Sequence, residues 1–243
     1  MSLYVYCLGD ELTRQAVEGV EGVEGVGDAQ VRVESFGKFV AVVSEFEGAR
    51  VRLTRENVEA HNRVNGRVLA ETTPLPFRFG TLVEAERLAA YLQANEAALS
   101  TALARVSGAV EMSVKVLWDT QAELREALGV EPASDDAAQT SSSAGSGAAF
   151  LEAKRRELAG AAALAERAEE IRAWLAEGLG DAVREERVTL SAAQALVVRA
   201  AHLVERERLA EYRARLEGLR REREARLRFL TSGAWPPYSF GEI

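Results

Sequence analysis

The sequence predicts an α+β protein of two domains: an N-terminal mixed α+β domain over residues 1–110 and a C-terminal ferredoxin-like (βαββαβ) domain with long helices over residues 111–243. Three observations predict this class. Short β-branched and aromatic segments alternate with Ala- and Leu-rich segments of helical period. The length of 243 residues suits two domains of ordinary size. A Ser-, Ala- and Gly-rich stretch at 131–149 contains no large apolar residue, so we expect a flexible insertion there.

The first third of the chain reads as a strand, a short helix and a hairpin. Residues 3–8 are β-branched and aromatic, and Gly9-Asp10 ends this strand. A short helix is expected from about residue 10 to residue 17. Two strand-like segments, 31–35 and 38–44, flank Phe36-Gly37, which predicts a hairpin with Gly37 at its turn.

Helices dominate the next part of the predicted N-terminal domain. Thr54 is a suitable N-cap for a helix that continues to about Glu71. The two prolines in 74–76 predict an extended connector, because a residue before proline avoids the α region. Residues 84–106 are expected to form one or two helices. Alternation in 112–118 predicts a strand with Val114, Val116 and Trp118 on one face.

The region after the insertion supplies the remaining elements of the second domain. These are a helix at 150–179, strands at 187–190 and 194–200, a helix at about 203–219 and a strand at 225–231. With the strand at 112–118 placed first, the order is βαββαβ, the split-βαβ pattern of ferredoxin-like domains. A helical hairpin or coiled coil over 150–230 is the alternative, although its heptads do not persist.

Composition excludes several classes of protein. The formal net charge of −8 disfavours binding to nucleic acid, since phosphate attraction requires a positive surface. A single cysteine excludes an intramolecular disulfide and a multi-cysteine zinc site. No apolar run approaches the ~20 residues of a membrane helix, and the start has no basic residue before its apolar stretch. We therefore expect a cytoplasmic protein without membrane or nucleic-acid partners.

No catalytic template is recognised, so we assign no catalytic residue, metal ligand or cofactor. His61 shares a helical stripe with Val58, Asn65 and Val68. It could act as a general base, but a partly buried, hydrogen-bonded histidine is the favoured interpretation. His202 is expected to be a solvated group at the start of a helix. Two histidines so far apart do not define a metal site.

Two aromatic segments are the candidate partner-binding residues. In the first, the alternation of an extended chain would place Phe77 and Phe79 on one face and Arg78 on the other. Arg78 could hold a phosphate or carboxylate, or pair with an internal acid. The second segment either packs on its own domain, which we favour, or anchors a partner. It consists of Trp235, Pro236, Pro237, Tyr238 and Phe240.

Five segments together resemble the gas vesicle protein F/L family. They are LYVYCLG at 3–9, FVAVVSEF at 39–46, His61 followed by PLPFRFGT at 74–81, EMSVKVLW at 111–118, and GAWPPYSF at 233–240. They occur in the family's order and span nearly the whole chain. Two departures are local: Ala234 replaces a usual proline, and 192–199 lacks an asparagine that often opens its counterpart.

The resemblance implies a non-enzymatic accessory protein of gas vesicle formation with two α+β domains. Its expected partners are the small hydrophobic shell protein and other gas vesicle accessory proteins, and its expected place is the cytoplasm and the gas vesicle. An enzyme is the alternative, with His61 as base and Arg78 as anion clamp in one pocket. An RNA-binding ferredoxin-like module ranks last, because the strand at 225–231 has only Phe229 for stacking on bases.

Overall fold

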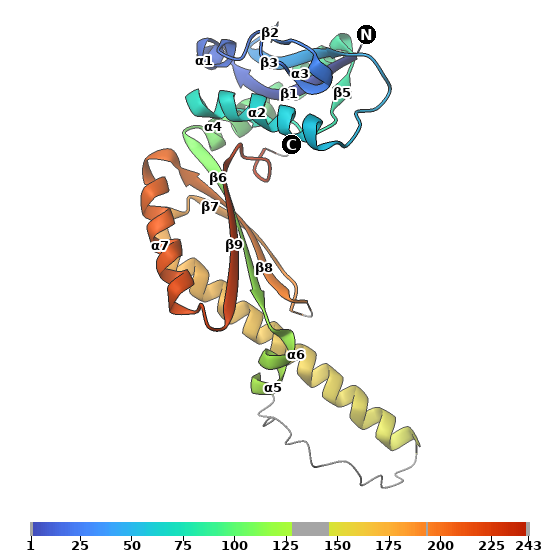
Figure 1. Ribbon diagram of the computed structural model, residues 1–243, viewed down its shortest axis with the longest axis vertical. Helices are drawn as coiled ribbons and strands as arrows, with labels where there is room; N and C mark the ends of the chain where they lie inside the picture. The colour runs from blue at the N-terminus through green and yellow to red at the C-terminus, as the bar shows by residue number, and fades with distance from the viewer. Residues whose placement is uncertain (1, 128–145, 193, 242–243) are drawn as a thin grey trace. The chain divides into compact units, whose positions relative to one another are not determined.

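The computed structural model describes residues 2–127, 146–192 and 194–241 (Figure 1). The chain forms two compact units. The first unit comprises Met1–Met112, Leu203–Glu207 and Ser232–Ile243, and the second comprises Ser113–His202 and Arg208–Thr231. Each unit draws on segments that are distant in the sequence, so neither is a single uninterrupted stretch of chain.

An antiparallel sheet organises the first unit. Its strands are β1 (Ser2–Asp10), β2 (Val31–Phe36), β3 (Phe39–Phe46), β4 (Leu75–Pro76) and β5 (Leu82–Val83). The order is β2-β3-β1-β4, and β5 also pairs with β1. The predicted hairpin is confirmed: Phe36 pairs with Phe39, and Gly37 has a φ of +64° at the turn. Only glycine adopts this left-handed conformation without strain.

Helices of the first unit follow the predicted pattern. They are α1 (Arg14–Glu18), α2 (Arg55–Glu71), α3 (Ala85–Ala94) and α4 (Glu96–Val106), with 3₁₀ turns η1 (Glu11–Thr13) and η2 (Val26–Asp28). Thr54 caps α2 as predicted, since its hydroxyl accepts the Asn57 amide at 3.3 Å. The segment 84–106 forms two helices.

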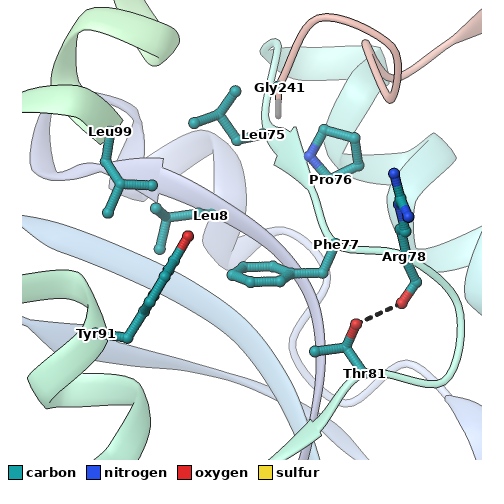
Figure 2. Close-up of a pocket in the computed structure, with 9 residues that line it drawn as sticks. All are labelled: Leu8, Leu75, Pro76, Phe77, Arg78, Thr81, Tyr91, Leu99 and Gly241. Atoms are coloured by element: carbon teal, nitrogen blue, oxygen red, sulfur yellow. Dashed lines mark hydrogen bonds between the residues drawn. The ribbon is translucent and has the colours of Figure 1, made fainter. Parts of the chain in front are cut away.

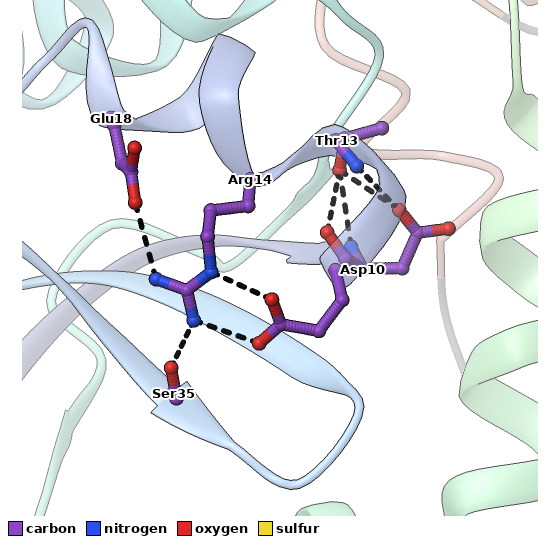
Figure 3. Close-up of polar contacts among 6 residues, drawn as sticks. Asp10, Thr13, Arg14, Glu18 and Ser35 are labelled. Carbon is purple, nitrogen blue, oxygen red and sulfur yellow. Dashed lines mark hydrogen bonds and ion pairs between the residues drawn. The ribbon is translucent and has the colours of Figure 1, made fainter.

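Polar contacts fix the short helical turn that follows β1 (Figure 3). The Asp10 carboxylate accepts the Thr13 amide at 2.9 Å, and the Thr13 hydroxyl accepts the Asp10 amide at 3.2 Å, which forms a capping box. The guanidinium of Arg14 pairs with Glu11 at 2.6 Å and with Glu18 at 3.2 Å. These bonds stabilise the turn between β1 and α1.

A tightly packed core lies between the sheet and helices α1 and α2. The fully buried members include Tyr4, Tyr6, Val40, Val42, Val64 and Val68. Tyr6 satisfies its hydroxyl within this core, since it accepts the Val26 amide at 2.8 Å and bonds to the Ser44 hydroxyl at 3.0 Å. The aromatic strand predicted at residues 3–8 therefore supplies both apolar area and buried polar anchors.

A second antiparallel sheet has the order β7-β8-β6-β9. Its strands are β6 (Ala109–Trp118), β7 (Glu185–Leu190), β8 (Leu196–Glu205) and β9 (Leu227–Trp235). The accompanying helices are α5 (Thr120–Ala127), α6 (Ser146–Leu179) and α7 (Leu209–Glu222), with 3₁₀ turns η3 (Gly180–Ala182) and η4 (Arg206–Arg208). These strands contradict the alternative of a helical hairpin or coiled coil over 150–230.

Helix α6 confirms the predicted helix at 150–179 and extends it at the N-terminal end. Its buried stripe includes Leu164, Ile171 and Leu175. The helix begins at Ser146, so the last four residues of the expected insertion at 131–149 are helical. The rest of that stretch, 131–145, lies outside the described residues.

Two sequence predictions that concern β8 and α7 are wrong. The helix expected from residue 203 begins at Leu209, because β8 continues to Glu205. His202 is therefore not a solvated group at a helix start: its side chain is 1 % exposed, and its Nδ1 lies 2.7 Å from the Tyr212 hydroxyl. Alternation places His202 with Val198, Ala200 and Val204 on the side of β8 that faces α7, where all four are buried.

Candidate functional site

The motif PLPFRFGT is built onto the edge of the first sheet. Leu75 and Pro76 pair with Leu8 and Cys7 of β1, and the Phe77 amide donates to the Tyr6 carbonyl at 2.8 Å. A proline at this position costs no hydrogen bond because β4 is an edge strand. The motif then turns, with Gly80 at a φ of +86°. The prolines thus hold the following aromatic residues at a defined place on the sheet.

A pocket of about 400 Å³, which we call the aromatic pocket, opens beside this motif (Figure 2). It is lined by Leu8, Leu75, Pro76, Phe77, Arg78, Thr81, Tyr91, Leu99 and Gly241. Figure 2 shows the Phe77 ring directed toward the Tyr91 side chain and the Arg78 guanidinium directed away from both. Tyr91 is 42 % exposed, so part of this wall is accessible from outside.

The lining of the aromatic pocket is mostly aliphatic and aromatic. None of its described lining residues carries a carboxylate, an imidazole or a thiol. The Thr81 hydroxyl donates to the Arg78 carbonyl at 2.7 Å, and this hydrogen bond closes the turn. What remains is an aliphatic and aromatic hollow with the side chain of Arg78 near its margin.

Phe77 and Phe79 do not share a face as the sequence pattern predicted. Phe77 lines the aromatic pocket, whereas the Phe79 ring lies edge-on to His61 and Tyr4, with ring centroids 5.8 and 6.3 Å away. The turn at Phe79-Gly80 breaks the extended geometry on which that prediction rested. Arg78, between them, is exposed.

His61 is a buried structural histidine, as the favoured interpretation expected. Its side chain is 2 % exposed, its Nδ1 lies 2.8 Å from the Tyr4 hydroxyl, and its Nε2 lies 2.9 Å from the Tyr238 hydroxyl. Burial lowers the pKa of His61 to about 4, so the ring is neutral near pH 7. His61 is not among the residues that line the pocket beside Arg78, whereas the enzyme interpretation places both in one pocket.

The tail, residues 232–241, packs on the chain itself, as the favoured interpretation expected, but within the first unit and not with the C-terminal domain to which the sequence assigned it. The Ser239 amide and hydroxyl donate to the Glu111 carboxylate at 2.7 and 2.9 Å. Phe240 is fully buried, and Pro236 and Pro237 are buried as well. Trp235 differs, because it is 39 % exposed and its indole donates to the Ser232 hydroxyl at 3.2 Å.

Several residues of this region were not singled out by the sequence. Glu111 is buried in β6, and its carboxylate accepts hydrogen bonds from the tail. Nothing in the alternating pattern of the strand distinguishes it from a solvent-exposed acid. Arg206 donates to the Thr72 carbonyl at 3.0 Å and to the Thr73 hydroxyl at 3.3 Å, and burial lowers its pKa. Tyr91 is the only aromatic residue in 84–106, a signal that could have marked it.

Within the described ranges, no group of three or more His, Cys, Asp or Glu side chains is arranged to hold a metal ion. Cys7 is buried, and burial raises the pKa of its thiol, which opposes a role as nucleophile. A membrane-crossing segment is also not found among the described helices, none of which is both long and apolar enough.

Comparison with known proteins decides the family. A model of the gas vesicle synthesis protein GvpL/GvpF family matches residues 2–242. The chain belongs to this family. Gas vesicle protein F1 of Halobacterium salinarum is 35 % identical over 121 residues, which are 48 % of this chain and 54 % of that protein. The match thus spans about half the length of this GvpF relative.

Two crystal structures of GvpF share the fold. GvpF from Anabaena sp. PCC7120 superposes with a TM-score of 0.79 over 100 % of this chain and 96 % of its own, at 21 % identity. GvpF from Microcystis aeruginosa gives a TM-score of 0.77 over 100 % and 99 %, also at 21 % identity. The α+β architecture with two antiparallel sheets is therefore the architecture of these GvpF structures.

Proposed function

We propose that this chain is a non-enzymatic accessory protein of gas vesicle formation that acts in the cytoplasm and at the gas vesicle. The observation that carries the proposal is the GvpL/GvpF family match over residues 2–242. Its partners are the hydrophobic shell protein and other gas vesicle accessory proteins, and it requires no cofactor, membrane or nucleic acid. Shell subunits expose apolar faces before they assemble, and such faces aggregate unless they are covered.

The aromatic pocket is the proposed docking point for an apolar side chain of such a partner. Phe77 and Tyr91 offer aromatic area at a partly exposed site, and Arg78 adds a positive charge at the margin. Aromatic anchors in a pocket provide most of the affinity of many protein interfaces. Trp235 is a second exposed aromatic residue on the tail. The buried residues of the tail and Phe79 would contribute by holding these surfaces in place.

We further propose that the second sheet and its helices form the ferredoxin-like domain expected in the region 111–243, and that residues 1–110 belong to a separate α+β domain, which the tail at 232–241 joins. Two features support this organisation. The elements β6, α6, β7, β8, α7 and β9 follow the order βαββαβ, interrupted by α5 and short turns. The sheet order β7-β8-β6-β9 places the first and third strands of that pattern at the centre.

Co-purification with the shell protein tests the docking proposal. Wild-type protein should retain the shell protein, whereas Phe77→Ser and Tyr91→Ser should each lose most of it because both remove aromatic area from the pocket. Leu53→Ser is the matched control, since Leu53 is 82 % exposed and does not line the pocket. Equal capture by all four proteins would remove the pocket from the proposal, and no capture by wild type would remove direct shell binding.

Deletion of residues 233–243 is a less specific test of the tail. It removes exposed Trp235 together with buried Phe240, so lost capture could follow from damage to the first unit. Trp235→Ala separates the two effects, because it leaves the buried part of the tail in place. Turnover of a metabolite by the purified protein, abolished by Arg78→Ala, would instead support the enzyme alternative.

A further inference from the structure

The second unit has a sheet whose two faces differ. The Phe229 ring of β9 lies against Trp174 of α6, with ring centroids 6.3 Å apart. His202 of β8 bonds to Tyr212 of α7 at 2.7 Å. These contacts identify the sides of β9 and β8 that face the helices. Because side chains alternate along a strand, the neighbouring positions lie on the opposite face, away from α6 and α7 (Figure 1). That face is open only in part, since Val197 and Leu203 of β8 also lie on it and are fully buried.

The exposed and half-buried positions of the face opposite the helices include basic and aliphatic side chains. On β6 the helix-facing valines Val114 and Val116 are fully buried, so Lys115 and Leu117 lie on the other side. The same alternation places Arg199 of β8 and Arg228 and Leu230 of β9 there. We call Lys115, Leu117, Arg199, Arg228 and Leu230 the basic face. Strand β6 lies between β8 and β9, so Lys115 is flanked by the strands that carry both arginines.

The three cations of the basic face are not neutralised within the described part of the chain. Neither Lys115, Arg199 nor Arg228 forms an ion pair or hydrogen bond with another described residue through its side chain. Other arginines of the same unit do, such as Arg167 with Glu123 at 3.0 Å. Like charges on adjacent strands repel. An acidic partner would relieve this repulsion.

The chemistry of the basic face favours protein over nucleic acid. Single-stranded RNA is held on open sheets by aromatic side chains that stack on its bases. The uncovered positions of the two central strands hold Lys115 and Leu117 on β6 and Arg199 on β8, and the aromatic Phe229 of β9 faces α6 instead. Leu230 is 44 % exposed and offers aliphatic contact area, which suits a protein surface.

The same chain carries a complementary acidic surface in its first unit. Residues 1–112 contain 16 Asp and Glu against 11 Lys and Arg. Glu21, Glu24 and Asp28 are exposed in the connection between α1 and β2, which we call the acidic loop. Glu18 is nearby but already forms an ion pair with Arg14 (Figure 3), so we do not include it in the acidic loop. Glu21 also accepts the Val33 amide at 3.4 Å, which restricts its carboxylate to this loop.

We propose that the basic face of one copy binds the acidic loop of a second copy, head to tail. The net charge of −8 opposes association only at long range, and salt near 0.15 M screens charges beyond about 8 Å. Contacts between Lys115 or Arg199 and Glu21 or Glu24 would act at shorter range. Such an interface joins two different surfaces, so each copy leaves one basic face and one acidic loop for further copies.

Sedimentation velocity of the full chain tests this self-association. In about 50 mM NaCl the weight-average mass should rise with protein concentration, and about 500 mM NaCl should weaken the association at least tenfold. Lys115→Glu/Arg199→Glu should remain monomeric, and so should Glu21→Arg/Glu24→Arg. An equimolar mixture of these two variants should associate again, because each acidic surface then meets a basic one. Circular dichroism checks that both variants keep the native spectrum.

The matched control is Arg52→Glu/Arg213→Glu, which changes the net charge equally at exposed positions outside the basic face and should associate like wild type. The proposal is overturned if wild type stays monomeric in low salt, or if the charge variants associate unchanged. It is also overturned if a fluorescein-labelled oligouridylate of about 20 nucleotides binds the basic face while the protein stays monomeric.

Discussion

His61 and Tyr238 are 177 residues apart in the chain, and the hydroxyl of Tyr238 lies 2.9 Å from Nε2 of His61. The tail thereby completes the hydrogen bonding of a histidine in the core of the first unit. Asn65 donates to the same hydroxyl at 3.3 Å, which adds a third side chain to the cluster. The terminal aromatic motif is therefore a structural element of the first unit, and it should affect the stability of residues far from it in sequence.

Substitution of Tyr238 by Phe should destabilise the first unit. It keeps the ring but removes the hydroxyl, so a buried ring nitrogen of His61 loses a partner, at a cost of about 1–2 kcal/mol. Urea denaturation followed by circular dichroism should show a lower midpoint with an unchanged slope. Tyr91→Phe is the control, because Tyr91 is 42 % exposed and should change the midpoint little. Equal midpoints for wild type and Tyr238→Phe would contradict the role of this bond.

Acidification should destabilise the protein before its carboxylates are protonated. Burial lowers the pKa of His61 and of His202 from 6.5 to about 4, so the unfolded chain binds protons in a range where the native protein does not. The free energy of unfolding therefore has its full value above the ordinary histidine pKa of 6.5, and it decreases as the pH falls from about 7 towards 4. Linkage gives a loss of about 2 kcal/mol per histidine between pH 7 and pH 5, measurable as a falling urea midpoint.

Variants of the two histidines separate their contributions. His61→Gln and His202→Gln should each lower stability at pH 7, because each removes a buried hydrogen bond. Each should also reduce the slope of the free energy of unfolding against pH, between pH 7 and pH 5, by an amount that corresponds to about one bound proton. A variant that keeps the full wild-type slope would show that its histidine is not the group that titrates.

Local sequence signals predicted the parts of the fold that depend on neighbouring residues. Gly37 marked the hairpin because a positive φ favours glycine, and Thr54 marked the start of α2 because its hydroxyl can reach the amide three residues on. The stripe around Leu164 and Ile171 marked α6 because its period is helical. Each signal lies within one turn or one element.

Long-range partners explain what the sequence did not reveal. His202 was expected at an exposed helix start, yet it lies in β8 and is buried, with Tyr212 of α7 as its hydrogen-bond partner. Glu111 is separated from Ser239 by 128 residues, so no local pattern connects them. The motif around Phe77 was recognisable, but the pocket beside it also needs Tyr91 and Leu99 from two other helices.

Glycine-to-alanine substitutions should have opposite effects at two positions of the first unit. Gly66 is exposed within α2, and a Cβ there would meet nothing within 4 Å, so Gly66→Ala should stabilise by about 0.5–1 kcal/mol. At Gly25 a Cβ would lie 2.1 Å from the Tyr6 hydroxyl, which must then move away from Val26 and Ser44. Gly25→Ala should lower the urea midpoint strongly. The reverse order of the two midpoints would contradict this packing.

The two large aromatic residues of the tail should differ sharply when each is replaced by alanine. Phe240 is fully buried, so Phe240→Ala should cost about 3–5 kcal/mol through lost burial and the cavity left behind. Trp235 is 39 % exposed, so Trp235→Ala should lower the free energy of unfolding far less. Thermal and urea denaturation of both variants measure the difference. If Trp235→Ala keeps wild-type stability but loses the shell protein in co-purification, Trp235 contacts the partner. If stability and capture fall together only in Phe240→Ala, the tail acts by holding the first unit together.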